Sequence, residues 1–170
     1  MIFETSVESP VGKLRLFATD AGLRAVLWPR QNHEKWRGET EPVERANHPV
    51  LLRAVKQLEE YFTNCRPVFD VPLDPVGTPF QLQAWSQLRD IPYGATRTYG
   101  EQAAAMGRPT ASRAVGAANG RNPLSIFVPC HRVIGANGSL TGFAGGLEIK
   151  RFLLALEGKN EDPNQMDQPP

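Results

Sequence analysis

One of the two cysteines in this 170-residue chain lies in a setting that favours chemistry over packing. Cys130 stands between Pro129 and His131, and Arg132 follows. A cysteine attacks as the thiolate, so its ordinary pKa of about 8.5 must be lowered by a positive charge, a helix N-terminus or a hydrogen-bonded base. We therefore predict that Cys130 is a nucleophile. Cys65 has no charged or catalytic pattern around it, and we interpret it as a packed or incidental thiol.

These residues alone leave the reaction open. A hydrolase nucleophile needs a histidine base, usually oriented by Asn or Asp. His131 is adjacent to Cys130 in sequence, and adjacent side chains seldom face each other well enough for direct proton transfer. A bridging water can still connect the two, with Glu157 orienting the imidazole. This relay is a hypothesis, and a buried inert cysteine is the alternative.

The net charge of +1 hides an uneven distribution. Residues 1–75 carry ten basic and eleven acidic side chains, residues 76–160 carry nine and four, and residues 161–170 carry none and three. The basic surplus around Cys130 suits a polyanionic partner, although a solvated basic surface would look the same.

Sequence features also exclude several classes of protein. No stretch approaches the roughly 20 apolar residues of a membrane span, and the first residues lack a signal-peptide pattern. We expect a soluble cytoplasmic protein, in which a disulfide between the two cysteines is disfavoured. His33, His48 and His131 show no ligand spacing, so we predict no metal.

Alternating apolar residues predict three strands near the N-terminus, over residues 2–7, 13–18 and 23–28, joined by tight turns into an antiparallel meander. Residues 29–46 are polar and predict a loop. Pro49 begins a helix whose apolar residues recur at helical spacing as far as Phe62. A short strand is expected over residues 68–71.

Prolines and glycine near residue 75 indicate a linker, followed by a mainly helical region. Thr78, Thr98 and Thr110 predict the N-caps of three helices, the last two over residues 99–106 and 111–119. Two short helices joined by a glycine-containing turn indicate a helix-turn-helix. The sequence thus predicts an α+β fold with domains at 1–75 and 76–160 and a disordered tail at 161–170.

The predicted helix over residues 111–119 consists mostly of very small residues and carries one long side chain, Arg113. Small residues allow a helix backbone to approach a narrow groove, which favours minor-groove contact and weak sequence preference. A single projecting arginine is typical of a wedge that replaces a displaced base. Close helix packing within the domain is the alternative explanation for the small residues.

Several ordered blocks together carry a family resemblance. They are Gly77-Thr78-Pro79-Phe80-Gln81 with Trp85, Ile91-Pro92-Tyr93-Gly94, Tyr99-Gly100, the run from Arg113 to Asn119, Asn122-Pro123, Pro129-Cys130-His131-Arg132-Val133-Ile134, and the run from Thr141 to Gly146. In these blocks the chain closely resembles the O6-alkylguanine-DNA alkyltransferases, which repair methylated DNA. The resemblance is dense over residues 77–158 and thin before them.

The resemblance implies a single-use, cofactor-free, monomeric repair protein that acts on double-stranded DNA. Cys130 would accept the alkyl group from O6 of a flipped guanine irreversibly. Whether O4-alkylthymine is also a substrate is left open by the sequence. His131 would act as the base through a water, oriented by Glu157. Tyr99 would crowd the 3′ phosphate, and we expect its hydroxyl to donate a proton to the leaving guanine.

The resemblance also implies which residues contact the substrate. The DNA-binding set is Arg113, Tyr99, Thr110, Ala111, Ser112, Ala114 and Gly116, with Arg113 filling the gap left by the flipped base. The guanine-pocket set is Asn122, Ser125, Val133, Phe143, Ala144 and Gly145, with Asn122 as the hinge between the recognition helix and the active-site loop.

Two departures from the family pattern affect these expectations. Phe143 stands where relatives commonly carry tyrosine, so one hydroxyl is missing from the pocket wall. Some members bind zinc in the N-terminal domain, whereas this chain has no cysteine before Cys65, and we predict no zinc. Two other functions stay open: a non-enzymatic lesion-recognition protein, against which Cys130 argues, and a cysteine hydrolase.

Overall fold

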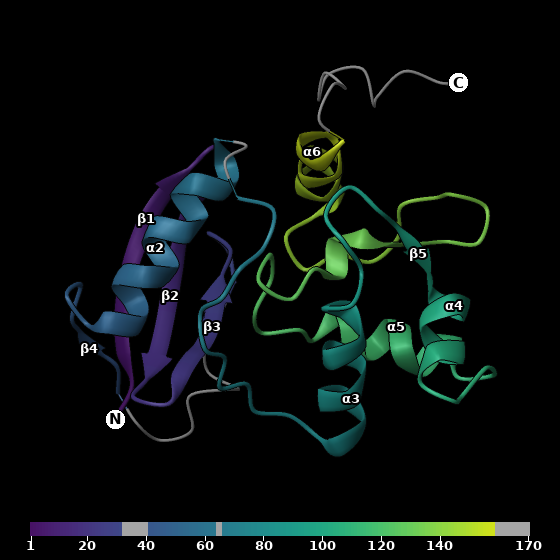
Figure 1. Cartoon of the computed structure of the whole chain (residues 1–170), viewed down its shortest axis with the longest axis horizontal. Helices are drawn as coiled ribbons and strands as arrows, with labels where there is room; N and C mark the ends of the chain where they lie inside the picture. Colours follow the sequence, from purple (N-terminus) through teal and green to yellow (C-terminus); the bar gives the residue numbers. More distant parts are fainter. Residues whose placement is uncertain (32–40, 64–65, 159–170) are drawn as a thin grey trace. The chain divides into compact units, whose positions relative to one another are not determined.

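The computed structural model describes residues 1–31, 41–63 and 66–158. The described residues divide into two compact units. The first comprises Met1–Val76 with Pro123–Ser125, and the second Gly77–Asn122 with the residues from Ile126 onward (Figure 1). Strands and helices are largely segregated along the chain, so the predicted α+β class is confirmed. The predictions for Cys65 and for the tail at 161–170 lie outside the described residues.

The first unit is built on a four-stranded sheet in the order β3-β2-β1-β4. Strands β1 (Phe3–Ser9), β2 (Gly12–Thr19) and β3 (Gly22–Leu27) form the predicted antiparallel meander. Strand β4 (Val43–Glu44) pairs in parallel with β1 inside the segment predicted to be a loop. Its two residues are exposed and lie in a polar stretch, so they give no strand pattern in the sequence.

Helix α2 (Pro49–Phe62) packs against the first three strands through an apolar face. His48 caps it, because Nδ1 of the imidazole accepts a hydrogen bond from the backbone N–H of Val50 at 3.3 Å. The strand expected over residues 68–71 does not form. The chain instead pairs slightly later, where Leu73 forms an isolated bridge with Leu23.

The second unit is mainly helical. Its elements are α3 (Pro79–Leu88), β5 (Arg97–Thr98), α4 (Tyr99–Ala105), α5 (Ser112–Gly120), the short 3-10 helix η1 (Cys130–Arg132), β6 (Val133–Ile134) and α6 (Leu147–Glu157). Within the described ranges, no helix combines the length and apolar character needed to cross a membrane.

Capping residues fix where the helices of the second unit begin. Thr78 and Thr98 each form a capping box, with Gln81 and Glu101 as the reciprocal partners, as the predicted N-caps require. The predicted cap at Thr110 is wrong. A turn closed by the 2.9 Å hydrogen bond from Ala111 N–H to the Arg108 carbonyl delays the helix, which begins at Ser112.

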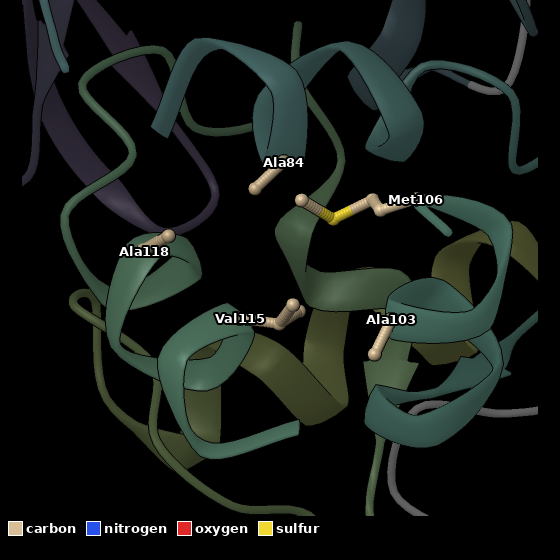
Figure 2. Packing of buried hydrophobic residues seen from close by; sticks show 5 residues of the cluster. All are labelled: Ala84, Ala103, Met106, Val115 and Ala118. Atoms are coloured by element: carbon tan, nitrogen blue, oxygen red, sulfur yellow. The ribbon is translucent and has the colours of Figure 1, made fainter. Parts of the chain in front are cut away.

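Small apolar residues form the core shared by α3, α4 and α5. Ala84, Ala103, Val115 and Ala118 are buried, and Met106 extends toward Ala84 to fill the space between the helices (Figure 2). Short side chains allow the helix backbones to approach closely. A tight and specific helix-turn-helix core results.

A buried polar pair lies beside this apolar core. The side-chain amides of Gln102 and Asn119 exchange two hydrogen bonds, of 3.0 and 2.8 Å, between α4 and α5. Gln102 also donates to the Ala84 carbonyl on α3. Because unpaired buried amides are costly, this pair selects one arrangement of the three helices.

Candidate active site

Cys130 begins the 3-10 helix η1 and is 6 % exposed. Its backbone N–H donates to the Val128 carbonyl at 2.9 Å. The same carbonyl accepts a hydrogen bond from the side-chain amide of buried Asn122 at 2.8 Å. The residue predicted to be a hinge therefore holds the backbone just ahead of the predicted nucleophile.

His131, Arg132 and Glu157 form a buried chain of charged and polar contacts. His131 Nε2 lies 2.6 Å from Glu157 Oε2. Arg132 donates from Nε to Oε1 of the same carboxylate at 2.7 Å and from Nη2 to Oε2 at 3.1 Å. The last residue of α6 is thus joined to both residues that follow the cysteine.

The protonation states follow from burial and from these partners. Burial raises the pKa of Glu157, but the charges and hydrogen bonds of His131 and Arg132 outweigh it and lower the pKa to about 2. The pKa of His131 is lowered, chiefly by burial and against the opposing effect of Glu157. We therefore assign an ionised Glu157 and a neutral His131.

This assignment determines the tautomer of His131. A neutral imidazole that donates from Nε2 to an ionised carboxylate keeps a lone pair on Nδ1. Nδ1 is buried and has no hydrogen-bond partner within the described ranges. His131 can therefore accept a proton at Nδ1.

Lys150 is a functional candidate that the sequence reasoning missed. It is fully buried, and its Nζ donates to the Thr141 carbonyl at 2.9 Å. Burial lowers the pKa of Lys150, and the negative charge of a Cys130 thiolate raises it. The signal in the sequence was its spacing, because Lys150, Leu153 and Glu157 recur on one face of a helix.

Tyr99, at the start of α4, is held by the loop that precedes α6. Its hydroxyl donates to the Thr141 carbonyl at 3.1 Å, the same acceptor that Lys150 uses. The Lys150 ammonium lies 6.0 Å from the centre of the Tyr99 ring. The Tyr99 hydroxyl, which was predicted to donate a proton to the leaving guanine, is therefore hydrogen-bonded to a backbone carbonyl in this structure.

The predicted DNA-binding residues lie on and just before α5. Arg113 and Ala114 are exposed, as is Thr110 in the preceding turn, whereas Ala111 and Ser112 are half-buried. Gly116 is half-buried against the Tyr99 ring, which an added Cβ would approach to 3.7 Å. The exposed side of α5 thus presents one arginine among small residues. Because Ala114 is exposed, packing within the domain does not account for its small side chain.

The predicted pocket residues are distributed over several elements. Val133 is buried in β6, which pairs in parallel with β5, while Phe143, Ala144 and Gly145 lie in the segment before α6. Ser125 belongs to the first unit, where its buried hydroxyl accepts a hydrogen bond from Trp28 Nε1 at 3.3 Å. Across the described residues, no group of three or more His, Cys, Asp or Glu side chains could hold a metal ion.

Sequence comparisons agree across both units. The family model described as the DNA binding domain of 6-O-methylguanine DNA methyltransferase matches residues 79–159. The model for the ribonuclease-like domain of the same proteins matches residues 2–75. A methylated-DNA--protein-cysteine methyltransferase of Methanosarcina acetivorans is 52% identical over 153 residues, which cover 89% of this chain and 95% of the relative. The constitutive enzyme of that name from Bacillus subtilis is 45% identical, with coverage of 92% and 96%.

The fold comparison gives the same result. The crystal structure of Mycobacterium tuberculosis OGT in complex with DNA matches with a TM-score of 0.83 and 44% identity, covering 94% of both chains. A second structure from that organism, of its O6-methylguanine methyltransferase, also has a TM-score of 0.83, with coverage of 98% of this chain and 100% of that one. This chain belongs to the family of 6-O-methylguanine DNA methyltransferases.

Proposed function

We propose that this protein repairs O6-alkylguanine in double-stranded DNA by transferring the alkyl group to its own Cys130. The observation that carries the proposal is the placement of Cys130 directly before a neutral, buried His131 that is hydrogen-bonded to Glu157. The relatives are named for methyl transfer to a protein cysteine, and one of the matching structures contains DNA.

In the proposed reaction, His131 accepts the thiol proton at Nδ1 through a water. The thiolate attacks the alkyl carbon in line with its bond to O6. A sulfur–carbon bond forms while the carbon–oxygen bond breaks, and its electron pair remains on guanine. The departing guanine then takes up a proton, so charge is balanced without a cofactor. Because a thioether is stable, each molecule reacts once.

The surface of α5 supports minor-groove binding with a flipped base. Arg113 is the long side chain that would occupy the space of the extruded guanine, and the exposed Ala114 leaves room for close approach of the backbone. We propose that Tyr99 exchanges its contact with Thr141 for one with the DNA. Asn122, Val133, Phe143, Ala144 and Gly145 would then surround the base.

The remaining features of the proposal follow from the chemistry. A single-use thiol must stay reduced, which favours the cytoplasm. One cysteine, one histidine and one carboxylate from the same chain suffice, so a monomer can act. We assign DNA binding and alkyl transfer to residues 76–160 and leave residues 1–75 a supporting role.

The central test is a mass measurement on the protein after reaction with a duplex containing O6-methylguanine. We expect one added methyl group, located on the peptide that bears Cys130, and no second addition with excess duplex. Cys130→Ala should bind the same duplex and leave it unrepaired. An unmodified Cys130 peptide after complete incubation would falsify alkyl transfer, and binding without modification would indicate a lesion-recognition protein instead.

Arg113→Ala should slow repair in duplex DNA more than reaction with the free O6-methylguanine base. The arginine stabilises the flipped state, which the free base does not need, so we expect at least about a tenfold loss in duplex and little change with free base. Single-turnover rates on both substrates measure this difference. Arg89→Ala, at another exposed arginine of the same unit, is the matched control. Equal losses on both substrates would remove this role from Arg113.

A further inference from the structure

We propose that the first unit binds an extended, basic peptide segment of another protein, which adds as a strand beside β1 and places an apolar side chain in a pocket against α2. This surface belongs to the first unit alone and takes no part in the alkyl-transfer chemistry of Cys130. Three features lie together on it: an open strand edge, an adjoining pocket, and two carboxylates that have no ionic partner among the described residues.

One edge of the four-stranded sheet is open over part of its length. Strand β1 continues to the hairpin, but β4 pairs only with its first two residues, Phe3 and Glu4. Among the residues that the structure describes, nothing pairs with residues 5–9 on this side. At the opposite edge of the sheet, β3 is bridged by Leu73 and Leu124. Proteins usually cover or shorten open edges, because the free backbone groups can pair with another chain.

The backbone geometry identifies the groups that face this edge. The carbonyls of Ile2 and Glu4 accept hydrogen bonds of 2.8 and 2.9 Å from β4 and the residue after it, so both carbonyls point away from β2. In a strand, the N–H and C=O groups of alternate residues point to the same side, so those of Ser6 and Glu8 face the open edge. They offer two donors and two acceptors at the spacing that an added strand requires.

A pocket of about 210 Å³ adjoins the open edge, between the last residues of β1 and the last turn of α2. Its apolar lining includes Val7 from β1 and Leu58 and Phe62 from α2. The helix runs alongside the strand (Figure 1), and His48, which caps the helix, stacks on Phe3 near the start of β1 with ring centres 4.6 Å apart. The pocket thus lies at the far end of both elements, where a side chain of an added strand would enter it.

The flank of α2 beside the pocket extends its apolar surface. Leu52, Val55 and Phe62 recur on this flank at helical spacing. Leu52 is 54 % exposed, and the other two are half-buried. The opposite flank of the helix carries Gln57, which contacts Asp70. The apolar flank therefore continues from the pocket along the helix and provides contacts for a second apolar side chain of an extended segment.

Charge determines the kind of partner that this surface fits. Glu8 and Glu59 line the pocket and are exposed, and within the described ranges neither carboxylate has an ion pair or hydrogen bond. Two uncompensated carboxylates beside an apolar pocket favour lysine or arginine next to the apolar side chain. They disfavour a second copy of this protein at the edge, since pairing would bring like charges of the two copies together. A basic segment of another protein is therefore the occupant.

Selection of short random peptides, displayed on phage, against the full-length protein tests this proposal. We expect the selected sequences to combine alternating apolar residues with lysine or arginine. In a synthetic copy of the most enriched peptide, N-methylation of one alternate set of amides should weaken binding by about tenfold or more, because it removes hydrogen bonds to β1 and leaves the side chains unchanged. N-methylation of the other set should have little effect.

Two substitutions separate backbone pairing from charge. Ser6→Pro removes an N–H that faces the open edge and keeps the pairing of β1 with β2, so it should weaken peptide binding by about tenfold. Glu59→Lys should weaken binding of the basic peptide and restore binding of a copy in which glutamate replaces the basic residues. Glu148→Lys, at an exposed carboxylate of the second unit, is the matched control and should leave peptide binding unchanged. Melting temperatures report whether each variant is folded.

Amide hydrogen exchange gives a direct readout of strand addition. In the wild type, bound peptide should slow exchange at Ser6 and Glu8 by about tenfold or more and leave Val7, which faces β2, unchanged. If no selected peptide depends on Ser6 and Glu59, or if a bound peptide does not protect these amides, the proposal is wrong. Dimerisation in sedimentation equilibrium that Ser6→Pro abolishes would also reject it, because a second copy would then occupy the edge.

Discussion

Replacing His131 with glutamine should slow methyl transfer from a duplex to Cys130 by about 100-fold near pH 7, in the range found for loss of a general base. Glutamine keeps an amide that can donate to Glu157 but has no proton acceptor of comparable basicity. Above about pH 9 the difference should narrow, because a thiol with an ordinary pKa of about 8.5 ionises without help. Single-turnover rates across this pH range measure both effects.

The pH dependence of the wild-type rate gives a second expected result. Burial lowers the pKa of His131, so the imidazole remains neutral and able to accept a proton as the pH falls to its ordinary value of about 6.5. The wild-type rate should therefore decline only below that value. His48→Gln, at a second buried histidine in the first unit, should leave the rate unchanged. A His131→Gln protein as fast as the wild type near pH 7 would show that His131 is not the base.

The parts of the fold that the sequence predicted well are those with strong local signals. Alternation gave β1 to β3, helical spacing gave α2, and the threonines of two capping boxes gave the starts of α3 and α4. Each of these depends on residues a few positions apart. The cap predicted at Thr110 failed because the competing signal was a backbone hydrogen bond, which side-chain chemistry does not reveal.

Contacts between residues far apart in the sequence could not be predicted from local signals of this kind. Residues 123–125 join the first unit because Val26 N–H donates to the Pro123 carbonyl at 2.8 Å and Val26 bridges Leu124. The next residue, Ile126, is buried with a φ of 76°, a conformation that a β-branched side chain rarely adopts. A boundary drawn from composition at residue 75 cannot show that the chain returns to the first unit.

The candidate active site likewise contains residues that the sequence identified and a long-range contact that it did not. Cys130, His131 and Glu157 were proposed from residue chemistry and resemblance, and the structure brings His131 and Glu157 within hydrogen-bond distance. Arg132 was considered only as a neighbouring charge, whereas its side chain binds the carboxylate of a residue 25 positions away. Which charges meet in a buried site depends on tertiary packing, and local spacing contains little of that information.

Glu157→Gln should destabilise the protein by about 3–5 kcal/mol near neutral pH, because it leaves the buried Arg132 without its ionic partner. The difference from the wild type should itself depend on pH. The pKa of Glu157 is lowered from 4.5 to about 2 in the folded protein, so below about pH 4.5 the unfolded chain takes up a proton that the folded one does not. The stabilisation is therefore present above about pH 4.5 and is lost as the pH falls toward 2, which amounts to about 3 kcal/mol.

Urea denaturation of both proteins at several pH values measures this difference directly. Subtracting the two free energies of unfolding removes contributions from other carboxyl groups, such as Asp70 and Asp74 in the first unit, whose pKa values are also lowered. Glu148→Gln, at an exposed carboxylate in the first turn of the same helix, is the matched control and should cost less than about 1 kcal/mol. A wild-type advantage that stays constant between about pH 5 and 2 would mean that Glu157 is not held ionised by Arg132 and His131, because only a depressed pKa makes the advantage disappear in acid.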